Sequence, residues 1–408
     1  MPNLTYEQLR EATAGGAVAL RSRTTLQPAG GKGDKVFPPT YSEGEGRNAR
    51  AVYAIDERGT VLLDSVASQA NRAELALLQG WDMGELEFPV PYVDFSEEIA
   101  DLGKLTVLEA PHRIADAIFR DSLLGGTLFR LSVIGQAITD ATPRNATALF
   151  HHSPTALLFG IWDSTGPKGG LGSKFQRAYV SEIVGHDAKI GNKVRSRIDP
   201  LQIKKLASDE RAYNHQDPNQ VWTFNPDEAE RDSKGEPVFA SRGTESGVAG
   251  QPSKINHGNV VPSIDGSTGG VTISKALQTT VLSLAALRRL RFACHGKGAE
   301  IAARTAIAAL GVAAIAYQYE MDYDLRSRCL LIPEHAPSVE LVGRDGSPAQ
   351  VVSLDRSTAA EILNQAASCA TQQGIGWSTS DMRLDPDPKL IELIKRSRKQ
   401  SATEQPTE

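Results

Sequence analysis

A polar stretch of residues 185–270, rich in Pro and Gly, separates two parts of the chain that carry regular apolar patterns. A compact domain rarely holds so long a loop without a use for it. Residues 186–205 carry six Lys/Arg against two Asp, and residues 207–236 carry eight Asp/Glu against three Lys/Arg. A basic arm followed by an acidic one predicts an interaction insertion, which we assign to residues 186–259.

Segments with helical or strand patterns flank this insertion and alternate irregularly. Before it, apolar spacing and capping residues predict a helix after Thr5, a strand at 17–27, a hairpin at 51–64, helices at 65–76, 112–124 and 131–138, a buried strand at 155–162 and a strand at 175–183. After it, they predict a short strand and a helix at 269–292, a long helix at 300–319, strands at 329–333, 339–343 and 350–354, and a helix at 358–373. Because hairpins join several strand pairs, we expect an α+β fold with a mostly antiparallel sheet. The polar residues 400–408 predict a disordered tail.

The charge and cysteine content narrow the classes of protein. A formal net charge of −5 argues against attraction of nucleic acid or anionic lipid to the whole surface. A local basic groove stays compatible with it, because counterion release depends only on the groups that touch phosphate. The three Cys residues form no CxxC pair, which argues against a zinc site or a disulfide framework and fits a reducing cytoplasm. The longest apolar run, 306–316, is too short to span a bilayer, so we expect a buried helix and no membrane partner.

The segment GPKGGLGSKF at 166–175 combines Gly turns with Lys168 and Lys174, and Arg177 follows it. Its glycine spacing does not fit the Walker A pattern, which argues against a nucleoside-triphosphate pocket. Backbone N–H groups in such turns can bind one or two phosphates, and a solvated loop between strands is the alternative. Trp162, at the end of the predicted buried strand, is either a core residue or a stacking platform for a base.

Polar side chains on two predicted helices also allow two interpretations. Gln69, Asn71 and Arg72 fall within one helical turn and form either a polar helix face or hydrogen bonds to a sugar-phosphate backbone. His112 and Arg113 stand at a predicted helix start, where N–H groups without helical partners favour an anion. His112 could be the general base of a metal-independent ribonuclease, but no second His or Tyr at a suitable spacing supports catalysis.

Three segments resemble the hallmark blocks of the crRNA-binding backbone subunit of type I-G (formerly I-U) CRISPR effector complexes, a family of the RAMP superfamily. The first is DSVASQANRAE, the second is PHRIADAIFRDS with FRLSVIG, and the third is LLFGIWDSTGPKGG with KFQRAYVSEIVG. The later stretch HGNVVPS, followed by GGVTISKALQTTVLSLAALRRLRF, resembles the same family.

This resemblance implies an RRM-like (modified ferredoxin-like) palm, formed by residues 1–185 and 260–399, with large insertions and a thumb-like hairpin in 186–259. It implies several copies along one crRNA, target DNA reached through the guide, other effector subunits and a separate helicase-nuclease. Such a subunit is not an enzyme and carries no cofactor or metal. The alternatives are a RAMP-type endoribonuclease that processes CRISPR repeat RNA, and a metabolic enzyme whose 166–172 loop holds a phosphorylated small molecule.

The resemblance also implies which residues touch RNA. In the three blocks they are Ser65, Gln69, Asn71, Arg72, His112, Arg113, Arg120, Lys168, Lys174 and Arg177. In the basic arm they are Lys189, Lys193, Arg195 and Arg197. Arg21 and Arg23 on the first strand, and Trp162, complete the expected interface.

Overall fold

The computed structural model describes residues 1–44, 49–165, 173–207, 209–241, 248–265, 268–293, 296–378 and 381–403. The chain divides into two compact units. The first consists of Met1–Lys189 and Val271–Ile391, and the second of Ile190–Gly270 and Glu392–Glu408.

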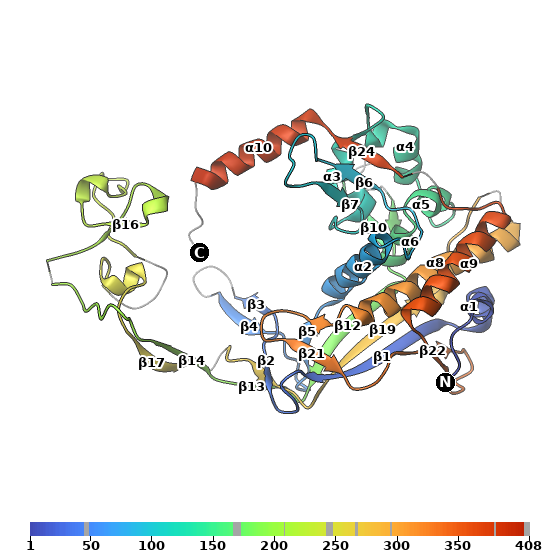
Figure 1. Ribbon diagram of the computed structural model, residues 1–408, viewed down its shortest axis with the longest axis horizontal. Helices are drawn as coiled ribbons and strands as arrows, with labels where there is room; N and C mark the ends of the chain where they lie inside the picture. Colours follow the sequence, from blue (N-terminus) through green and yellow to red (C-terminus); the bar gives the residue numbers. More distant parts are fainter. Residues whose placement is uncertain are drawn as a thin grey trace. The chain divides into compact units, whose positions relative to one another are not determined.

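The largest sheet of the first unit has eight strands and lies on one side of that unit (Figure 1). Its strands run in the order β20 (Tyr323–Asp324), β21 (Leu330–Pro333), β1 (Ala19–Pro28), β19 (Lys275–Ser283), β12 (Tyr179–His186) and β5 (Val61–Asp64). In addition, β22 (Ser338–Val342) pairs with β1 and with β23 (Gln350–Ser353). All of these pairs are antiparallel, which confirms the expected α+β class with mostly antiparallel pairing.

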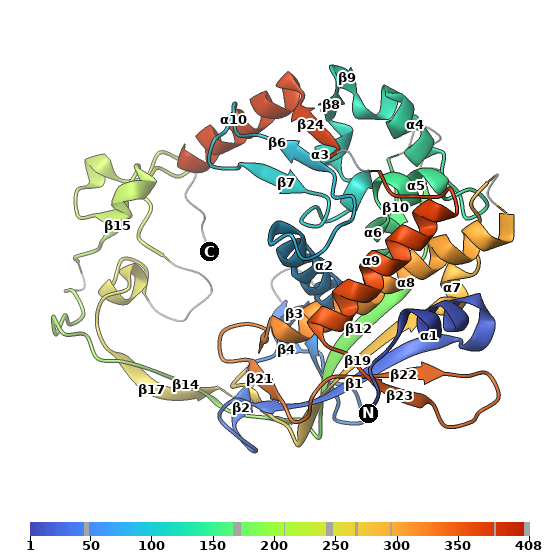
Figure 2. The same cartoon turned by 45° about the vertical axis from the view of Figure 1, so that its right-hand side comes forward.

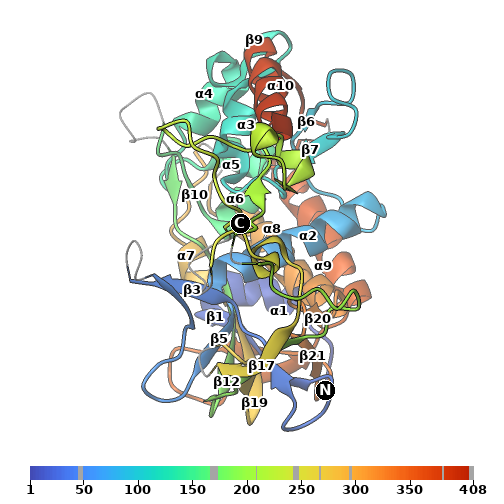
Figure 3. The ribbon, with the colours of Figure 1, turned by 90° about the vertical axis from the view of Figure 1, so that its left-hand side faces the viewer.

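Two connections that contain helices each join strands that are not neighbours in the sheet. Helix α2 (Val66–Asp82) lies between β1 and β12 in the chain, and β19 separates these two strands in the sheet. Helix α8 (Gly296–Glu320) connects β19 to the β20–β21 hairpin, and β1 separates β19 from β21 in the sheet. Side chains of β19 alternate between buried and half-buried positions, so one face of the sheet packs against helices. Figure 3 shows the sheet as one layer, with α2, α8 and α9 (Arg356–Gln372) as the next.

Helix α8 is the core helix of the first unit. By length and composition it could cross a membrane, but 89% of its most apolar window is buried inside the fold. Helices α2 and α9 pack along it (Figures 1 and 2), and the sheet covers another side. A helix that is apolar all round suits such a position, and the prediction of a long helix at 300–319 is confirmed.

Between α2 and β12 the chain forms an additional layer with its own small sheet. Its strand order is β7 (Lys104–Thr106), β6 (Tyr92–Asp94), β24 (Arg383–Pro386), β8 (Ser122–Leu124) and β9 (Thr127–Leu128). Strand β24 comes from the other end of the chain and runs parallel to β6. The helices of this layer are α3 (Ala117–Arg120), α4 (Val133–Thr139), α5 (Thr147–His152) and α6 (Thr155–Phe159).

Short elements complete the first unit. Thr5 precedes helix α1 (Tyr6–Glu11), and its side chain forms the expected cap. The other elements are β2 (Lys35–Val36), β3 (Thr40–Glu43), β4 (Arg50–Tyr53), β10 (Ile161–Trp162), β11 (Lys174–Phe175), β18 (Val271–Thr272) and α7 (Leu284–Leu287). Helix α10 (Pro388–Thr403) begins in the first unit and belongs to the second from Glu392 onward. It extends into the segment 400–408 that we expected to be disordered, and 404–408 lie outside the described residues.

Two predicted elements are wrong because a local break interrupts an apolar pattern. The predicted helix at 112–124 consists of a 3₁₀ turn (Arg113–Ala115), α3 and β8. Asp116 has an extended backbone and caps α3 with its side chain, which ends the first turn. The predicted strand at 155–162 is helix α6 followed by β10, because a run of apolar residues does not distinguish a buried helix from a buried strand.

Two more predictions are wrong in pairing or length. The predicted hairpin at 51–64 does not form as one unit, since β4 pairs with β3 and β5 pairs with β12. A single bridge between Ile55 and Val61 joins its two arms. In the segment 269–292 the strand is the long element, β19, and the helix α7 has four residues.

The second unit contains an exposed two-stranded ribbon of β14 (Lys193–Arg197) and β17 (Val260–Asp265), which pair antiparallel. It also contains a small module built around β15 (Tyr213–Asn214) and β16 (Trp222–Thr223). Tyr213 and Phe239 stack in this module, with ring centroids 5.1 Å apart.

Candidate nucleic-acid interface

Gln69, a predicted RNA contact, lies at the centre of a buried hydrogen-bond network between α2 and the sheet. It is 1% exposed. Its side-chain oxygen accepts hydrogen bonds from Gln278 Nε2 at 2.8 Å and Gln318 Nε2 at 3.1 Å. Ser181 Oγ donates to the same oxygen at 3.0 Å, and Gln69 Nε2 donates to Asp64 at 2.6 Å. Because so deeply buried a side chain cannot reach an RNA strand, we assign Gln69 a structural role.

The other residues of the first block fix α2 or lie on its surface. The Ser65 hydroxyl accepts a hydrogen bond from the first turn of α2 at 3.3 Å and caps the helix. Arg72 donates to Asp64 at 3.0 Å and to the carbonyl of Leu325 at 2.7 Å. Asn71 is exposed. Asn71 is therefore the residue of this block that is best placed to contact a ligand.

Arg113, in the second block, is buried and pairs with Glu74 through two hydrogen bonds of 2.5 and 2.8 Å. It also donates to the carbonyl of Gly160 at 3.2 Å. Burial raises the pKa of Glu74, and the charge of Arg113 opposes that shift. The neighbouring His112 is exposed, whereas Arg120 pairs with the carboxylate that follows it in the chain. Arg113 thus serves the fold, and of the three predicted contacts in this block only His112 is classed as exposed.

Arg21 and Arg23 lie on the face of β1 whose side chains remain half-buried or exposed. Both pair with Glu340 of β22, Arg21 at 2.5 Å and Arg23 at 3.1 Å. Burial raises the pKa of Glu340, but hydrogen bonds and charge from the two arginines lower it by more, so this pKa lies below its ordinary value. An RNA phosphate would compete with Glu340 for both arginines.

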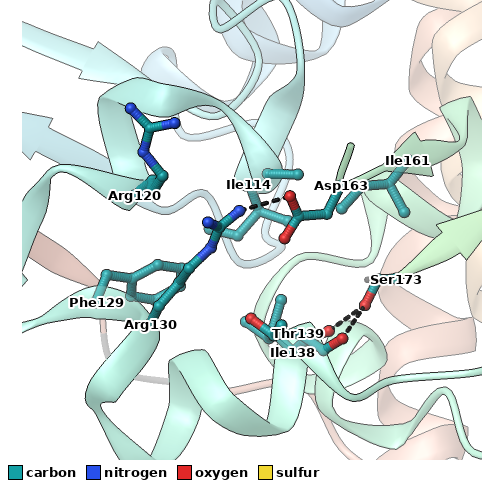
Figure 4. Close-up of a pocket in the computed structure, with 10 residues that line it drawn as sticks. Ile114, Arg120, Phe129, Arg130, Ile138, Thr139, Ile161, Asp163 and Ser173 are labelled. Atoms are coloured by element: carbon teal, nitrogen blue, oxygen red, sulfur yellow. Dashed lines mark hydrogen bonds and ion pairs between the residues drawn. The ribbon is translucent and has the colours of Figure 1, made fainter. Parts of the chain in front are cut away.

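Both ends of the Gly-rich segment are fixed to the layer that contains α4 (Figure 4). On one side, Arg130 pairs with Asp163 at 2.5 Å and donates to the carbonyl of Thr165 at 2.9 Å. On the other side, the Ser173 hydroxyl donates to carbonyls at the end of α4, and the Ser173 carbonyl accepts from Asp163 N at 2.9 Å. The adjoining cavity of about 10 Å³ has room for one water molecule. Residues 166–172, which include Lys168, lie outside the described residues.

Four exposed side chains beside this segment form what we call the Trp162–Arg289 surface: Trp162, Lys174, Gln176 and Arg289. Trp162 is 59% exposed and pairs with Lys174 across β10 and β11. The Lys174 ammonium lies 5.3 Å from the centre of the Trp162 ring. Arg289 donates to the side-chain oxygen of Gln176 at 3.2 Å. An aromatic ring among cations is a suitable platform for a nucleic-acid base.

A half-open groove of 360 Å³ lies within this surface, between β11 and α7. Its rim carries Lys174, Gln176 and Arg289. Its floor and walls are apolar and consist of Pro143, Leu157, Phe175, Ala178, Ala286, Leu287 and Leu290. The described residues that line the groove include no carboxylate. The groove therefore combines a positive rim with an apolar floor.

Arg177 is exposed and follows the groove-lining segment along the chain. It packs against Gly160, whose φ is +83°. A Cβ atom at this position would lie 2.9 Å from Arg177 Cγ and 3.0 Å from the carbonyl oxygen of Phe175. Glycine thus allows the chain to leave α6 and pass close to the strand that carries the surface.

The predicted basic residues of the insertion are all exposed: Lys189, Lys193, Arg195 and Arg197. The last three lie on the ribbon of the second unit. Val194 and Ile264 face each other across this ribbon and are 68% and 73% exposed. A two-stranded ribbon with so little buried apolar surface is marginally stable on its own, so it is suited to dock on a partner.

Gln176 and Arg289 were not among the predicted contacts. Sequence alone gave no reason to separate Arg289 from its neighbours in the run at 288–291. In the structure, Arg288 donates to the carbonyls of Ala12 and Ala17, while Arg289 lines the groove. The exposed residues on either side of Phe175 were a usable signal, since alternation on a strand places Lys174 and Gln176 on the same side.

The part of the chain that contains most of the predicted contacts is similar to a known protein family. Residues 20–190 match the model of the family described as CRISPR-associated protein GSU0053. A search of curated proteins found no match. The matched range contains all three blocks, Trp162, Lys174, the strands β5 and β12, and all of β1 except its first residue. Residues 20–190 are therefore similar to a CRISPR-associated, RAMP-type protein family.

Proposed function

We propose that this CRISPR-associated protein is a non-catalytic, crRNA-binding backbone subunit of a type I-G surveillance complex. Strand order is the observation that carries the proposal. The order β21-β1-β19-β12, with α2 and α8 as the connecting helices, is that of a ferredoxin-like βαββαβ unit. It supports an RRM-like palm, with the insertion that contains the β14–β17 ribbon between two of its strands.

The distribution of charge supports RNA as the ligand. The net charge is −5, so general attraction of nucleic acid is weak. The Trp162–Arg289 surface and the basic face of the β14–β17 ribbon nevertheless offer exposed cations, and the first adds an exposed indole ring. Local cations bind phosphates, and an aromatic ring stacks on bases without reading their sequence.

In this proposal the partners are crRNA, target DNA through the guide, further copies of the chain, other effector subunits and the helicase-nuclease. The subunit positions the guide, and base pairing between guide and target supplies sequence recognition. We also propose that it cuts no nucleic acid and acts in the cytoplasm. Incubation with labelled repeat RNA and EDTA tests the absence of cleavage, because intact RNA after hours contradicts a metal-independent ribonuclease.

The decisive experiment measures the mass of the protein by light scattering with single-stranded RNAs of increasing length. A backbone subunit binds additional copies as the RNA grows, so the mass should rise in steps. A mass of one protomer at every length would contradict the proposal. Binding should also weaken steeply with salt, because phosphate contacts release counterions.

A further inference from the structure

We propose that the groove between β11 and α7 binds one nucleotide of single-stranded RNA, with its base on the apolar floor and its phosphate at Lys174 and Arg289. This inference rests on the proposed function, because it takes RNA as the ligand. It goes further in giving a base, and not only the backbone, a binding site on the protein.

The rim of the groove presents hydrogen-bond donors. Lys174 and Arg289 carry only donors. Gln176 has both a donor and an acceptor, but its oxygen already accepts a hydrogen bond from Arg289 at 3.2 Å. Its NH₂ group therefore remains for a ligand. Three donors and two positive charges, with no carboxylate among the described lining residues, fit an anion with several acceptor oxygens, such as a phosphodiester.

The apolar floor of the groove distinguishes between the ligands that the rim would accept. Leu157, Phe175, Leu287 and Leu290 are buried apolar side chains that border a volume of 360 Å³. Inorganic phosphate would use the rim and leave the floor in contact with water. A neutral apolar peptide would cover the floor and leave the cations without a counter-charge. A nucleotide satisfies both parts, because a flat base adjoins a charged phosphate.

Trp162 extends the site beyond the groove. Lys174 lines the groove and also lies 5.3 Å from the centre of the Trp162 ring. A base that stacks on Trp162 and a base in the groove would therefore both lie near the same ammonium group. The phosphate that links the two nucleotides would be its partner. Both contacts tolerate any base, since every base has a flat apolar face.

The test compares two single-stranded RNAs of roughly 8 to 16 nucleotides, one complete and one abasic at every position. A site for bases predicts that the wild-type protein binds the abasic RNA roughly 5- to 100-fold more weakly, whereas backbone contacts alone predict equal affinities.

Two variants assign the effect to the groove. Gln176→Glu adds a carboxylate among the donors and should weaken binding of the complete RNA by about tenfold, while the abasic RNA changes less. The matched control Gln136→Glu makes the same charge change on α4, at an exposed position outside the groove lining, and should preserve the preference for complete RNA. Arg289→Ala should act like Gln176→Glu, and Arg291→Ala like the control.

Each outcome has one meaning. Equal affinity of the wild-type protein for complete and abasic RNA overturns the nucleotide site and leaves the backbone-binding function intact. A preference that Gln176→Glu and the control change equally also overturns the site, because the base then binds elsewhere. Absence of binding to either RNA contradicts the proposed function itself.

Discussion

The guanidinium of Arg113 and the carboxylate of Glu74 form a bidentate ion pair inside the first unit, with side chains 9% and 3% exposed. Glu74 belongs to α2, and Arg113 belongs to the layer inserted between α2 and β12. The pair fixes that layer to α2, and through the carbonyl of Gly160 Arg113 also holds the segment that leads to the Trp162–Arg289 surface.

Arg113→Met should lower the free energy of unfolding by about 3–5 kcal/mol, because it leaves the Glu74 carboxylate buried without a counter-charge. The double variant Arg113→Met with Glu74→Leu should recover part of the loss. Chemical denaturation measures both. Arg120→Ala, which removes a more exposed pair, should cost less than about 1 kcal/mol, and an equal cost for the two arginines would contradict the prediction.

Gln69→Leu should destabilise the fold by about 2–4 kcal/mol, because Ser181, Gln278 and Gln318 lose a shared acceptor in a buried network. Asn71→Ala on the exposed side of the same helix should change stability by no more than about 0.5 kcal/mol. Denaturation curves check both variants. If Gln69→Leu kept full stability and lost RNA affinity, the structural role assigned to Gln69 would be wrong.

Glu340 should make stability depend on pH. Its pKa in the folded protein is lower than its ordinary value of 4.5, so its contribution is complete above that pH. The contribution disappears as the pH falls through the lowered pKa, because the unfolded chain then binds the proton more readily. Urea unfolding from about pH 6 to about pH 3 should find the wild-type protein more stable than Glu340→Gln at the upper end, with the difference vanishing at the lower end. A constant difference would contradict this assignment.

Trp162→Ala should weaken binding of single-stranded RNA by roughly 5- to 100-fold, as expected when a stacked base loses its platform. Trp162→Phe retains an aromatic face and should keep most of the affinity. Because Trp162 is exposed, neither change should unfold the protein. Fluorescence anisotropy measures the affinities, and equal losses for Ala and Phe would argue against stacking.

Lys193→Ala with Arg195→Ala should reduce the salt dependence of RNA binding. If both side chains contact phosphates, the slope of log affinity against log salt should fall by about 1.4 for a single strand. Both residues lie on β14 and, two positions apart, on the same side of the ribbon. Lys234→Ala, another exposed lysine of the second unit, is the matched control and should leave the slope unchanged.

Helix periodicity predicts that Gln69 is buried, although its polar side chain suggests an exposed position. Gln69 precedes Ala73 by four positions and Ala76 by seven, so it shares their buried face. Asn71 falls on the opposite side and is exposed. The positions of α8, β1 and β12 followed from such periodic patterns, because each of these elements buries a continuous face or stripe.

Other features depend on partners that are distant in sequence. The sequence around Arg113 does not indicate that its partner is Glu74, which lies 39 residues earlier. The groove likewise combines β11 with α7, more than a hundred residues apart, so Arg289 gained its role only when the two were brought together. The strand pairing of β4 and β5 was wrong for the same reason, since each strand found its partner outside the predicted hairpin.

Because β24 is synthesised long after its neighbours in the sheet, the inserted layer cannot complete its sheet until late in synthesis. Strand β24 lies between β6 and β8, both of which leave the ribosome more than 250 residues before it. The inserted layer therefore keeps two unpaired strand edges until residues 383–386 have been translated. A polypeptide that ends before residue 383 would leave those edges free to pair with other chains. A chaperone that shields them during synthesis would improve the yield of protein that contains β24.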